Sequence, residues 1–511
     1  MTFEETQELD NAWSFAERKL FAEWVRKCSL VQAQFAIYPN QGRRSEELLV
    51  TIPAELLHAI AAPGGGRVAI VIGAGWSVEA PTEMPLAAPL AHDVERRLVL
   101  EGVLQQGQCD DPWDLAALAT LVWQKTGTQA ALVHRFPLDR MRLAKPNLGY
   151  RLLVALMAEG AVTHVLSLNF DLAVQNAATE LGSDISIIDA AGQAVPVRAA
   201  VVHLHGNANS DSEQLVLRLE EIDQGWFGQW EQIVVQQILG APILLFAGLG
   251  SAAPVLTSTI GLIQKALDGG KALYQADIGD YDANHFAEQL NIAPEHYIQG
   301  SWCTVLAKLA ERVAAEQAHA LAVNGTSLLK ENGVPDADRD RFNVLAGRFQ
   351  NLSLLALGKL RAFANLDVRR VYRPHEQRDD ELIAEPMVKL AQLAEHLGFE
   401  AQPTSGGTWR LMRNGQLVAQ LVLASGGGVR RSAALEPLLK RVCDYIDENS
   451  PMGLDFVLVG GLAAGEHHLQ HVDIIADQNP ADIIGGPSTP PLISANDPEF
   501  VRRVGILLNA A

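Results

Sequence analysis

Cysteine is scarce in this sequence, with four residues among 511. They stand far apart, at Cys28, Cys109, Cys303 and Cys443, and none forms a C-x-x-C pair. The sequence therefore predicts neither a disulfide framework nor a four-cysteine zinc site, and the expected compartment is a reducing cytoplasm.

Positive charge is also in short supply, because 40 lysines and arginines face 60 aspartates and glutamates. The formal net charge of −20 argues against a broad basic surface, so we expect no direct binding to nucleic acid. A local basic groove, or nucleic acid held through a partner protein, stays compatible with this charge.

Signals for secretion, membrane insertion and ATP hydrolysis are missing as well. The stretch "MTFEETQELDNAW" is acidic and lacks the apolar run of a signal peptide. No G-x-x-x-x-G-K-[ST] phosphate loop occurs. Residues 232–263 carry no charge, but glycines and prolines interrupt them, which favours a short buried strand at 243–247 over a membrane span.

The order of the apolar runs predicts the fold class. From residue 67 onward, short apolar runs alternate with helical stretches, which is typical of an α/β fold with a doubly wound parallel sheet of the Rossmann type. Strands are expected at 68–72, 163–167, 200–204, 243–247 and 272–276. The long stretch between the first two strands predicts a helical insertion.

Several domains are expected, because 511 residues exceed what one core usually holds. Residues 1–60 predict a helical N-terminal region, 61–320 the α/β domain, and 321–511 a smaller α+β domain. A long amphipathic helix is expected over 300–324.

The last region is expected to contain a β-hairpin at 409–423, because Asn414-Gly415 is a strong two-residue turn signal. A helix is expected at 434–449 and a strand at 454–461, followed by a loop-rich end. His467 and His471 have a helical spacing suited to zinc, but no third ligand has a convincing spacing, so we expect a solvated polar face and no metal site.

Four polar or glycine-rich features follow predicted strands, where open α/β sheets bind their ligands. Each also has a purely structural interpretation: a tight turn for the glycine loops, a helix cap for the Asn/Asp pair, and a satisfied structural group for the histidine. In chain order the features are Gly73-Ala74-Gly75 with Ser77, then Asn169 with Asp171, then His205-Gly206, then Gly248 with Gly250 and Ser251.

In this order the four features resemble the sirtuins and their NAD-hydrolysing relatives. That family has a G-A-G-x-S loop, then a strand ending in (T/S)-x-N-x-D, then a strand ending in H-G, then a late strand with G-x-S. The resemblance covers residues 61–315, including "PNLGYRLLVALMAEGAVTHVLSLNFD" before the Asn/Asp pair. It implies a sirtuin-type domain that uses NAD.

The differences between this sequence and the deacylase sirtuins indicate which branch of the family it resembles. Deacylase sirtuins hold a structural zinc with two cysteine pairs, which this chain lacks, and their G-I-P-D-F-R stretch is absent too. Leu168 replaces the usual glutamine, and His203 stands where a lysine is common. These differences are similar to those of the NAD hydrolases of bacterial anti-phage systems, so the resemblance implies NAD hydrolysis without structural zinc.

The resemblance also implies roles for individual residues. Gly73, Ala74, Gly75 and Ser77 would hold the pyrophosphate, together with the late loop of Gly248, Gly250 and Ser251. Asp171 would bind the nicotinamide carboxamide, and Asn169 the nicotinamide ribose and an attacking water. His205 would accept a proton from a ribose hydroxyl or from that water.

Two other functions stay open: an NAD-dependent protein deacylase, and a module that senses NAD or ADP-ribose without cleaving it. Defence-type relatives work as large self-assemblies, with a ring ATPase of the HerA type, or with a short Argonaute. We therefore expect a homo-oligomer or one of these partners, and residues 321–511 are the expected place for regulation or assembly.

Overall fold

The computed structural model describes most of the chain beyond residue 49. The described residues are 50–62, 67–189, 192–196, 199–223, 229–249, 260, 272–364, 379–425, 440, 442–443, 446, 453–460, 490–495 and 497–510. The chain divides into two compact units, Met1–Leu49 and Val50–Ala511, and every described residue belongs to the second. Most of the predicted N-terminal helical region therefore lies outside the described residues, apart from helix α3 (Ala54–Ala61).

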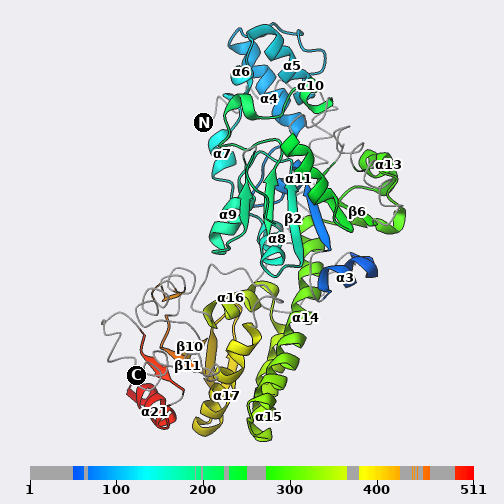
Figure 1. The fold of residues 1–511 in the computed structure, drawn as a ribbon. Coiled ribbons are helices and arrows are strands. Elements are labelled where there is room, and N and C mark those ends of the chain that lie inside the picture. The colour runs from blue at the N-terminus through cyan, green and yellow to red at the C-terminus, as the bar shows by residue number, and fades with distance from the viewer. Residues whose placement is uncertain are drawn as a thin grey trace. The chain divides into compact units, whose positions relative to one another are not determined.

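A seven-stranded parallel sheet forms the centre of the first half, which confirms the predicted fold class (Figure 1). All five predicted strands are present within one residue of their expected ends. Its order is β3-β4-β2-β1-β5-β6-β7, made by β1 (Val68–Ile72), β2 (Val162–Ser167), β3 (Ser186–Ile188), β4 (Ala200–His203), β5 (Ile243–Ala247), β6 (Ala272–Asp277) and β7 (Tyr297–Gln299).

The sheet is doubly wound because the chain leaves β1 toward β2 and later returns to the other side of β1 as β5. Alternate residues of β1 face opposite cores, as the period of a strand requires. Ile70 belongs to the core that includes helices α8 (Leu148–Ala158) and α14 (Trp302–Glu331). Val71 belongs to the core that includes α11 (Gln229–Leu239) and α13 (His285–Gln289). Strands buried on both faces explain the unbroken apolar runs.

The predicted helical insertion is present between β1 and β2. It contains α4 (Ala87–Leu100), α5 (Leu115–Thr126), α6 (Ala130–Val133) and α7 (Leu138–Arg142). Asp114 caps α5 by accepting two backbone N–H groups, and Gly127 ends it in the left-handed conformation. Helix α10 (Leu219–Asp223) packs on α5 beyond one end of the sheet (Figure 1).

A second, five-stranded sheet confirms the smaller α+β region. Its order is β12-β11-β10-β9-β8, made by β8 (Glu400–Pro403), β9 (Trp409–Arg413), β10 (Gln416–Ser425), β11 (Phe456–Gly460) and β12 (Leu492–Ser494). The predicted hairpin is β9–β10, and Asn414 and Gly415 both have positive φ, as its two-residue turn requires. Its helices are α15 (Asp336–Ala346), α16 (Leu354–Ala364), α17 (Asp379–Leu397) and α21 (Phe500–Ala510).

Helix α14 joins the two sheets. Its 30 residues pack on α3 and α8 and also on α15, α16 and α17. The division predicted at residue 320 falls inside this helix and stays a prediction. The segment predicted as a helix at 434–449 lies mostly outside the described residues, and His467 and His471 lie wholly outside them.

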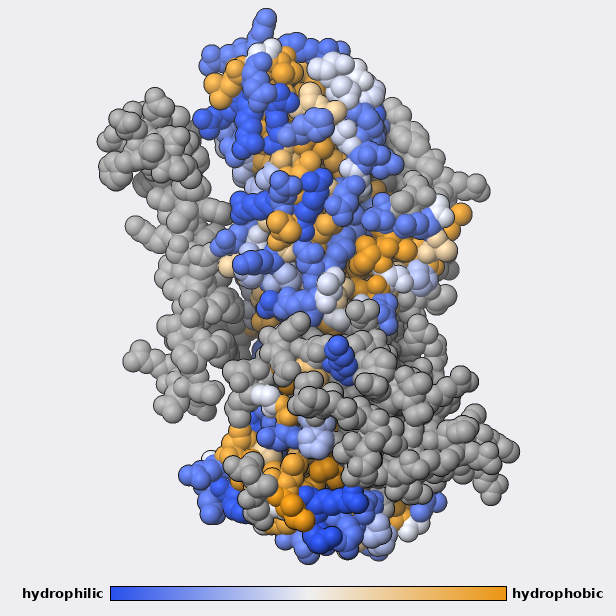
Figure 2. Space-filling model, turned by 90° about the vertical axis from the view of Figure 1, so that its left-hand side faces the viewer, coloured by the Kyte–Doolittle hydropathy of each residue, from blue (hydrophilic) through white to orange (hydrophobic). Residues whose placement is uncertain are grey.

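On the face drawn in Figure 2, hydrophilic side chains cover most of the coloured surface and apolar side chains lie among them. Within the described ranges, no helix combines the length and the apolar character that crossing a membrane requires. The uncharged stretch that needed this check forms α11 and the buried strand β5, as far as it is described.

Candidate functional site

The ends of β1, β2 and β4 meet at one edge of the parallel sheet. Leu168 donates its backbone N–H to Ile72 O at 3.0 Å, and Leu204 donates to Ser167 O at 3.2 Å. Each bond extends the ladder one residue past a strand, so the polar residues that follow lie side by side. This edge is where the strand order reverses at β1, the usual ligand position in such sheets.

The glycines after β1 and β5 let two loops cross in direct backbone contact. A Cβ on Gly73 would lie 2.6 Å from Gly248 O, and one on Gly75 would lie 2.8 Å from Gly248 Cα. Gly75 N–H donates to Gly248 O at 3.0 Å, and Gly248 itself has φ +68°. The tight-turn interpretation and the binding-loop interpretation are compatible here. The crossing brings both loops to the edge of the sheet where the strand order reverses at β1. Gly250 and Ser251 lie outside the described residues.

Ser77 is buried and belongs to a polar network with residues from three other positions. Its Oγ donates to Asp171 Oδ2 at 2.7 Å and lies 2.7 Å from Tyr150 Oη. Asn169 Nδ2 lies 3.2 Å from both Ser77 Oγ and Tyr150 Oη. The structure therefore brings together Ser77, Asn169 and Asp171, and it adds Tyr150, which we did not predict.

Tyr150 reaches the network from the first turn of α8. Asn147 caps this helix by accepting Tyr150 N–H at 3.1 Å, and its Nδ2 donates to Trp76 O at 3.0 Å. Burial, with Asp171 nearby, raises the pKa of Tyr150 well above 10, so its hydroxyl stays a hydrogen-bond donor at neutral pH. The sequence signal for it is weak, because a tyrosine within an apolar helix is usually a core residue.

Hydrogen-bond directions fix the orientation of the Asn169 amide. As a carboxylate, Asp171 only accepts, so the Ser77 hydroxyl donates to it. Tyr150 then donates to Ser77, and both hydroxyl oxygens accept from Asn169 Nδ2. The amide oxygen, Asn169 Oδ1, is left buried without a partner among the described residues. A fixed, unpartnered acceptor is suited to binding a water or a substrate hydroxyl.

Asp171 has a structural role as well as its place in this network. Its Oδ1 accepts Ala173 N–H at 3.0 Å, at the start of α9 (Ala173–Glu180). Burial raises the pKa of Asp171, while the hydrogen bonds from Ser77 and Ala173 lower it. Asp171 therefore accepts a backbone N–H at the start of α9, although the N-cap residue of this helix is Leu172, and it takes part in the polar network as well.

The two histidines at the end of β4, His203 within the strand and His205 just beyond it, lie in different surroundings. His203 is 3% exposed and both ring nitrogens have partners: Nδ1 lies 3.2 Å from Asn169 O, and Nε2 lies 2.7 Å from Gln175 Nε2. His205 keeps part of its surface exposed, and its ring has no hydrogen bond to the described residues. Desolvation lowers the pKa of each to about 4, so each is neutral at pH 7. Only His205 retains free ring nitrogens for proton transfer.

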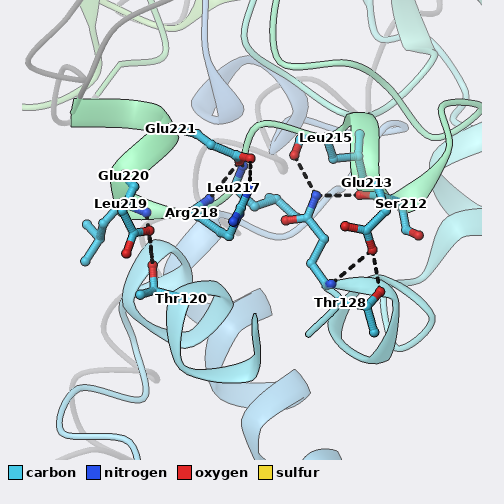
Figure 3. Close-up of polar contacts among 11 residues, drawn as sticks. Thr120, Thr128, Ser212, Glu213, Leu215, Leu217, Arg218, Leu219, Glu220 and Glu221 are labelled. Atoms are coloured by element: carbon cyan, nitrogen blue, oxygen red, sulfur yellow. Dashed lines mark hydrogen bonds and ion pairs between the residues drawn. The ribbon is translucent and has the colours of Figure 1, made fainter. Parts of the chain in front are cut away.

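The helical insertion holds the segment that follows His205 (Figure 3). Val216 donates its N–H to His205 O at 3.1 Å, and the fully buried Gln129 donates to the adjacent Leu215 O at 2.8 Å. Thr128 and Gln129 both donate to the Glu213 carboxylate, as the dashed lines of Figure 3 show for the first of them.

Helix α5 adds a second contact to this segment. Thr120 bonds to Glu220, and the Arg218 guanidinium lies 3.9 Å from the Trp123 ring centre. The insertion therefore restrains the loop that carries His205. No local pattern in the sequence signals this role of the insertion, because the contacting residues lie far apart in the chain.

Comparisons with known proteins find likeness only among solved structures. No protein-family model matches this chain, and no curated protein matches it. A mutant Sir2 homologue in complex with ADP-ribose is similar at 16% identity and TM-score 0.32, covering 51% of this chain and 96% of that one. A Sir2 homologue–NAD complex has 16% identity and TM-score 0.29, covering 54% and 96%. At these scores the likeness carries no argument about activity, and the sheet topology stands on its own geometry.

Proposed function

We propose that this chain hydrolyses NAD to nicotinamide and ADP-ribose. The observation that carries the proposal is Asn169 Oδ1, a buried acceptor whose direction is set by the Ser77–Tyr150–Asp171 network and which has no described partner. It lies at the sheet edge where the strand order reverses, beside the loop that carries His205.

The reaction needs few reactive groups. The bond between the ribose C1′ and the nicotinamide nitrogen breaks with its electron pair returning to the nicotinamide ring, which leaves as a neutral molecule. Charge develops on the ribose, so positioning and electrostatics contribute more than a strong nucleophile. Water adds its oxygen to C1′ and releases one proton.

The three predicted catalytic residues and the glycine loop after β1 each have a place in this proposal. Asn169 Oδ1 would accept a hydrogen bond from the attacking water or a ribose hydroxyl, and the free ring of His205 would take the proton. Asp171 would face the carboxamide. The crossing glycine loops, with Gly73, Ala74 and Gly75, would let the pyrophosphate approach the backbone closely. The N–H groups of Gly73 and Gly75 are used within the crossing, where they donate to Ala247 O and Gly248 O.

The remaining expectations belong to the same proposal. Unrestrained NAD hydrolysis would deplete a cell, so an effector of anti-phage defence needs a gate, and residues 321–511 offer the additional structure for one. A partner of the HerA or short-Argonaute type, or self-assembly, would supply the trigger. The cytoplasm, where NAD is abundant, is the compartment that this proposal requires.

The test is NAD consumption by the chain expressed with its genomic neighbours, with and without phage challenge. Asn169→Ala and His205→Ala should each lower turnover at least about 100-fold, the size of a lost acid–base or positioning group. Asp171→Ala should mainly raise KM. Matched controls are Asn332→Ala and His285→Ala, because both side chains are exposed and lie outside the site.

Three outcomes separate the rival functions. Nicotinamide release without any acylated peptide supports hydrolysis, and release that strictly requires such a peptide would support a deacylase instead. NAD that binds but stays intact in the activated complex would support a sensing module. Unchanged turnover in a folded Asn169→Ala or His205→Ala variant would remove these residues from the mechanism.

A further inference from the structure

A second set of contacts holds Asn169 from the main-chain side. Asn169 O accepts from His203 Nδ1 at 3.2 Å, and Asn169 N–H donates to Ser167 Oγ at 3.3 Å. The chain has already left β2 here, so the sheet ladder no longer serves these groups. A buried carbonyl without a partner would be destabilising, and His203 satisfies it.

The partners of His203 define its tautomer. A carbonyl oxygen can only accept, so Nδ1 carries the proton, and in a neutral ring Nε2 must then be an acceptor. Gln175 supplies the matching donor: its Nε2 lies 2.7 Å from His203 Nε2. Gln175 belongs to the first turn of α9. Turning the Gln175 amide over would place two acceptors against each other. The two contacts therefore allow only one set of donor and acceptor directions along the hydrogen-bonded series Gln175–His203–Asn169.

Burial keeps this arrangement stable against competing water. His203 is 3% exposed and pairs with Ser167 across the parallel ladder, so its ring has little freedom to turn. Its lowered pKa keeps the ring neutral, which preserves Nε2 as an acceptor for Gln175.

We propose that His203 and Gln175 are positioning residues that fix the peptide of Asn169, so that the Asn169 side chain keeps its unpartnered acceptor oxygen in place. The inference rests on the proposed function and extends it. The two histidines of "HLHG" then divide the work: His203 orients Asn169, and His205 is left free for the proton.

Two variants of His203 distinguish the effect of its Nδ1–H donor from the effect of ring packing. His203→Phe keeps an aromatic ring but removes both nitrogens, and His203→Asn places an amide near the position of Nδ1. A misplacement of a positioned group by about 1 Å costs on the order of 100-fold in rate. We therefore expect kcat to fall about 100-fold in His203→Phe with KM little changed, and His203→Asn to recover most of that loss.

Gln175→Ala tests the outer contact without touching the strand. It should lower kcat about tenfold, whereas Gln289→Ala, an exposed glutamine on α13, should not change it. Equal kcat in Gln175→Ala and Gln289→Ala would overturn the role of Gln175, and full activity in a folded His203→Phe variant would overturn the proposal as a whole.

A spectroscopic measurement keeps the inference separate from NAD hydrolysis. Long-range ¹H–¹⁵N spectra of histidine-labelled protein should show His203 protonated at Nδ1 only, with the signal assigned by its loss in His203→Asn. Gln175→Ala should give a mixture of tautomers. A wild-type His203 protonated at Nε2 would refute the arrangement.

If the wild-type protein does not hydrolyse NAD, only the proposed function fails. Positioning is then read from the affinity for ADP-ribose. His203→Phe should weaken that affinity about tenfold, and unchanged affinity would overturn the positioning role.

Discussion

At the scale of single residues, one hydroxyl decides how the Asn169 amide is held. Tyr150 Oη lies 2.7 Å from Ser77 Oγ and 3.2 Å from Asn169 Nδ2, so it links the Ser77 hydroxyl to the Asn169 amide. Its ring also packs near Trp76, with centroids 5.9 Å apart. A phenylalanine at this position would keep the packing and remove only the polar link.

Tyr150→Phe should therefore lower kcat about tenfold, because a lost hydrogen bond of about 1.4 kcal/mol leaves the Asn169 amide free to turn over. Tyr281→Phe is the matched control, since it removes a hydroxyl that bonds to Ile292 O at 2.8 Å, in the region of the short helix η3 (Tyr281–Ala283) and of α13. Steady-state kinetics on both variants checks the prediction. Equal kcat values would show that Tyr150 serves packing alone.

At the scale of elements, the crossing of the β1 and β5 loops leaves no room for side chains. A Cβ on Gly248 would lie 2.5 Å from Trp76 N, and its φ of +68° disfavours any other residue. The sheet edge and the network around Ser77 both depend on this crossing.

Gly248→Ala should lower the free energy of unfolding by about 2 kcal/mol or more, from the left-handed backbone together with the clash. Gly347→Ala is the control, because a Cβ there meets no atom within 4 Å and its φ is −57°. Urea unfolding followed by circular dichroism measures both. A Gly248→Ala midpoint equal to that of Gly347→Ala would contradict the steric argument.

The parts of the fold that the sequence predicts are those with a local pattern. Five strands are continuous apolar runs and were placed correctly, whereas β3 is three residues long and half-buried at two of them, too short for a pattern. The Asn/Asp pair was found because polar residues directly follow a strand.

The partners within the site could not be predicted in the same way. Ser77 and Asp171 are 94 residues apart, and Ser77 and Tyr150 are 73 apart. Only tertiary structure selects such pairs, and both Tyr150 and Gln175 stand in sequences that read as ordinary helix. For this reason the sequence does not predict the contacts of Tyr150 and Gln175 with the site.

At the scale of the described unit, both sheets share one continuous apolar core. The cluster that contains Ile70 of β1 also contains Leu421 of β10, and Leu306 and Leu329 of α14 belong to it. A buried ion pair joins the same regions: Arg361 of α16 binds both oxygens of Glu159, at the end of α8, at 2.9 and 2.7 Å.

We therefore expect residues 50–511 to unfold in one cooperative transition. Arg361→Met leaves the Glu159 carboxylate buried without this cation, which should cost about 3–5 kcal/mol and move the whole transition to lower temperature. Glu159→Gln combined with Arg361→Met should recover part of the loss. Calorimetry of the three proteins is the measurement, and a thermogram that splits into two peaks would argue against a shared core.

The shared core has a thermodynamic consequence for regulation. When two regions fold as one unit, a ligand that stabilises one of them is linked in free energy to any partner that binds the other. This linkage is reciprocal: a partner on the second sheet that tightens NAD binding must itself be bound more tightly, by the same factor, when NAD is present. In such a molecule the concentration of NAD would determine what fraction of the protein has the partner bound.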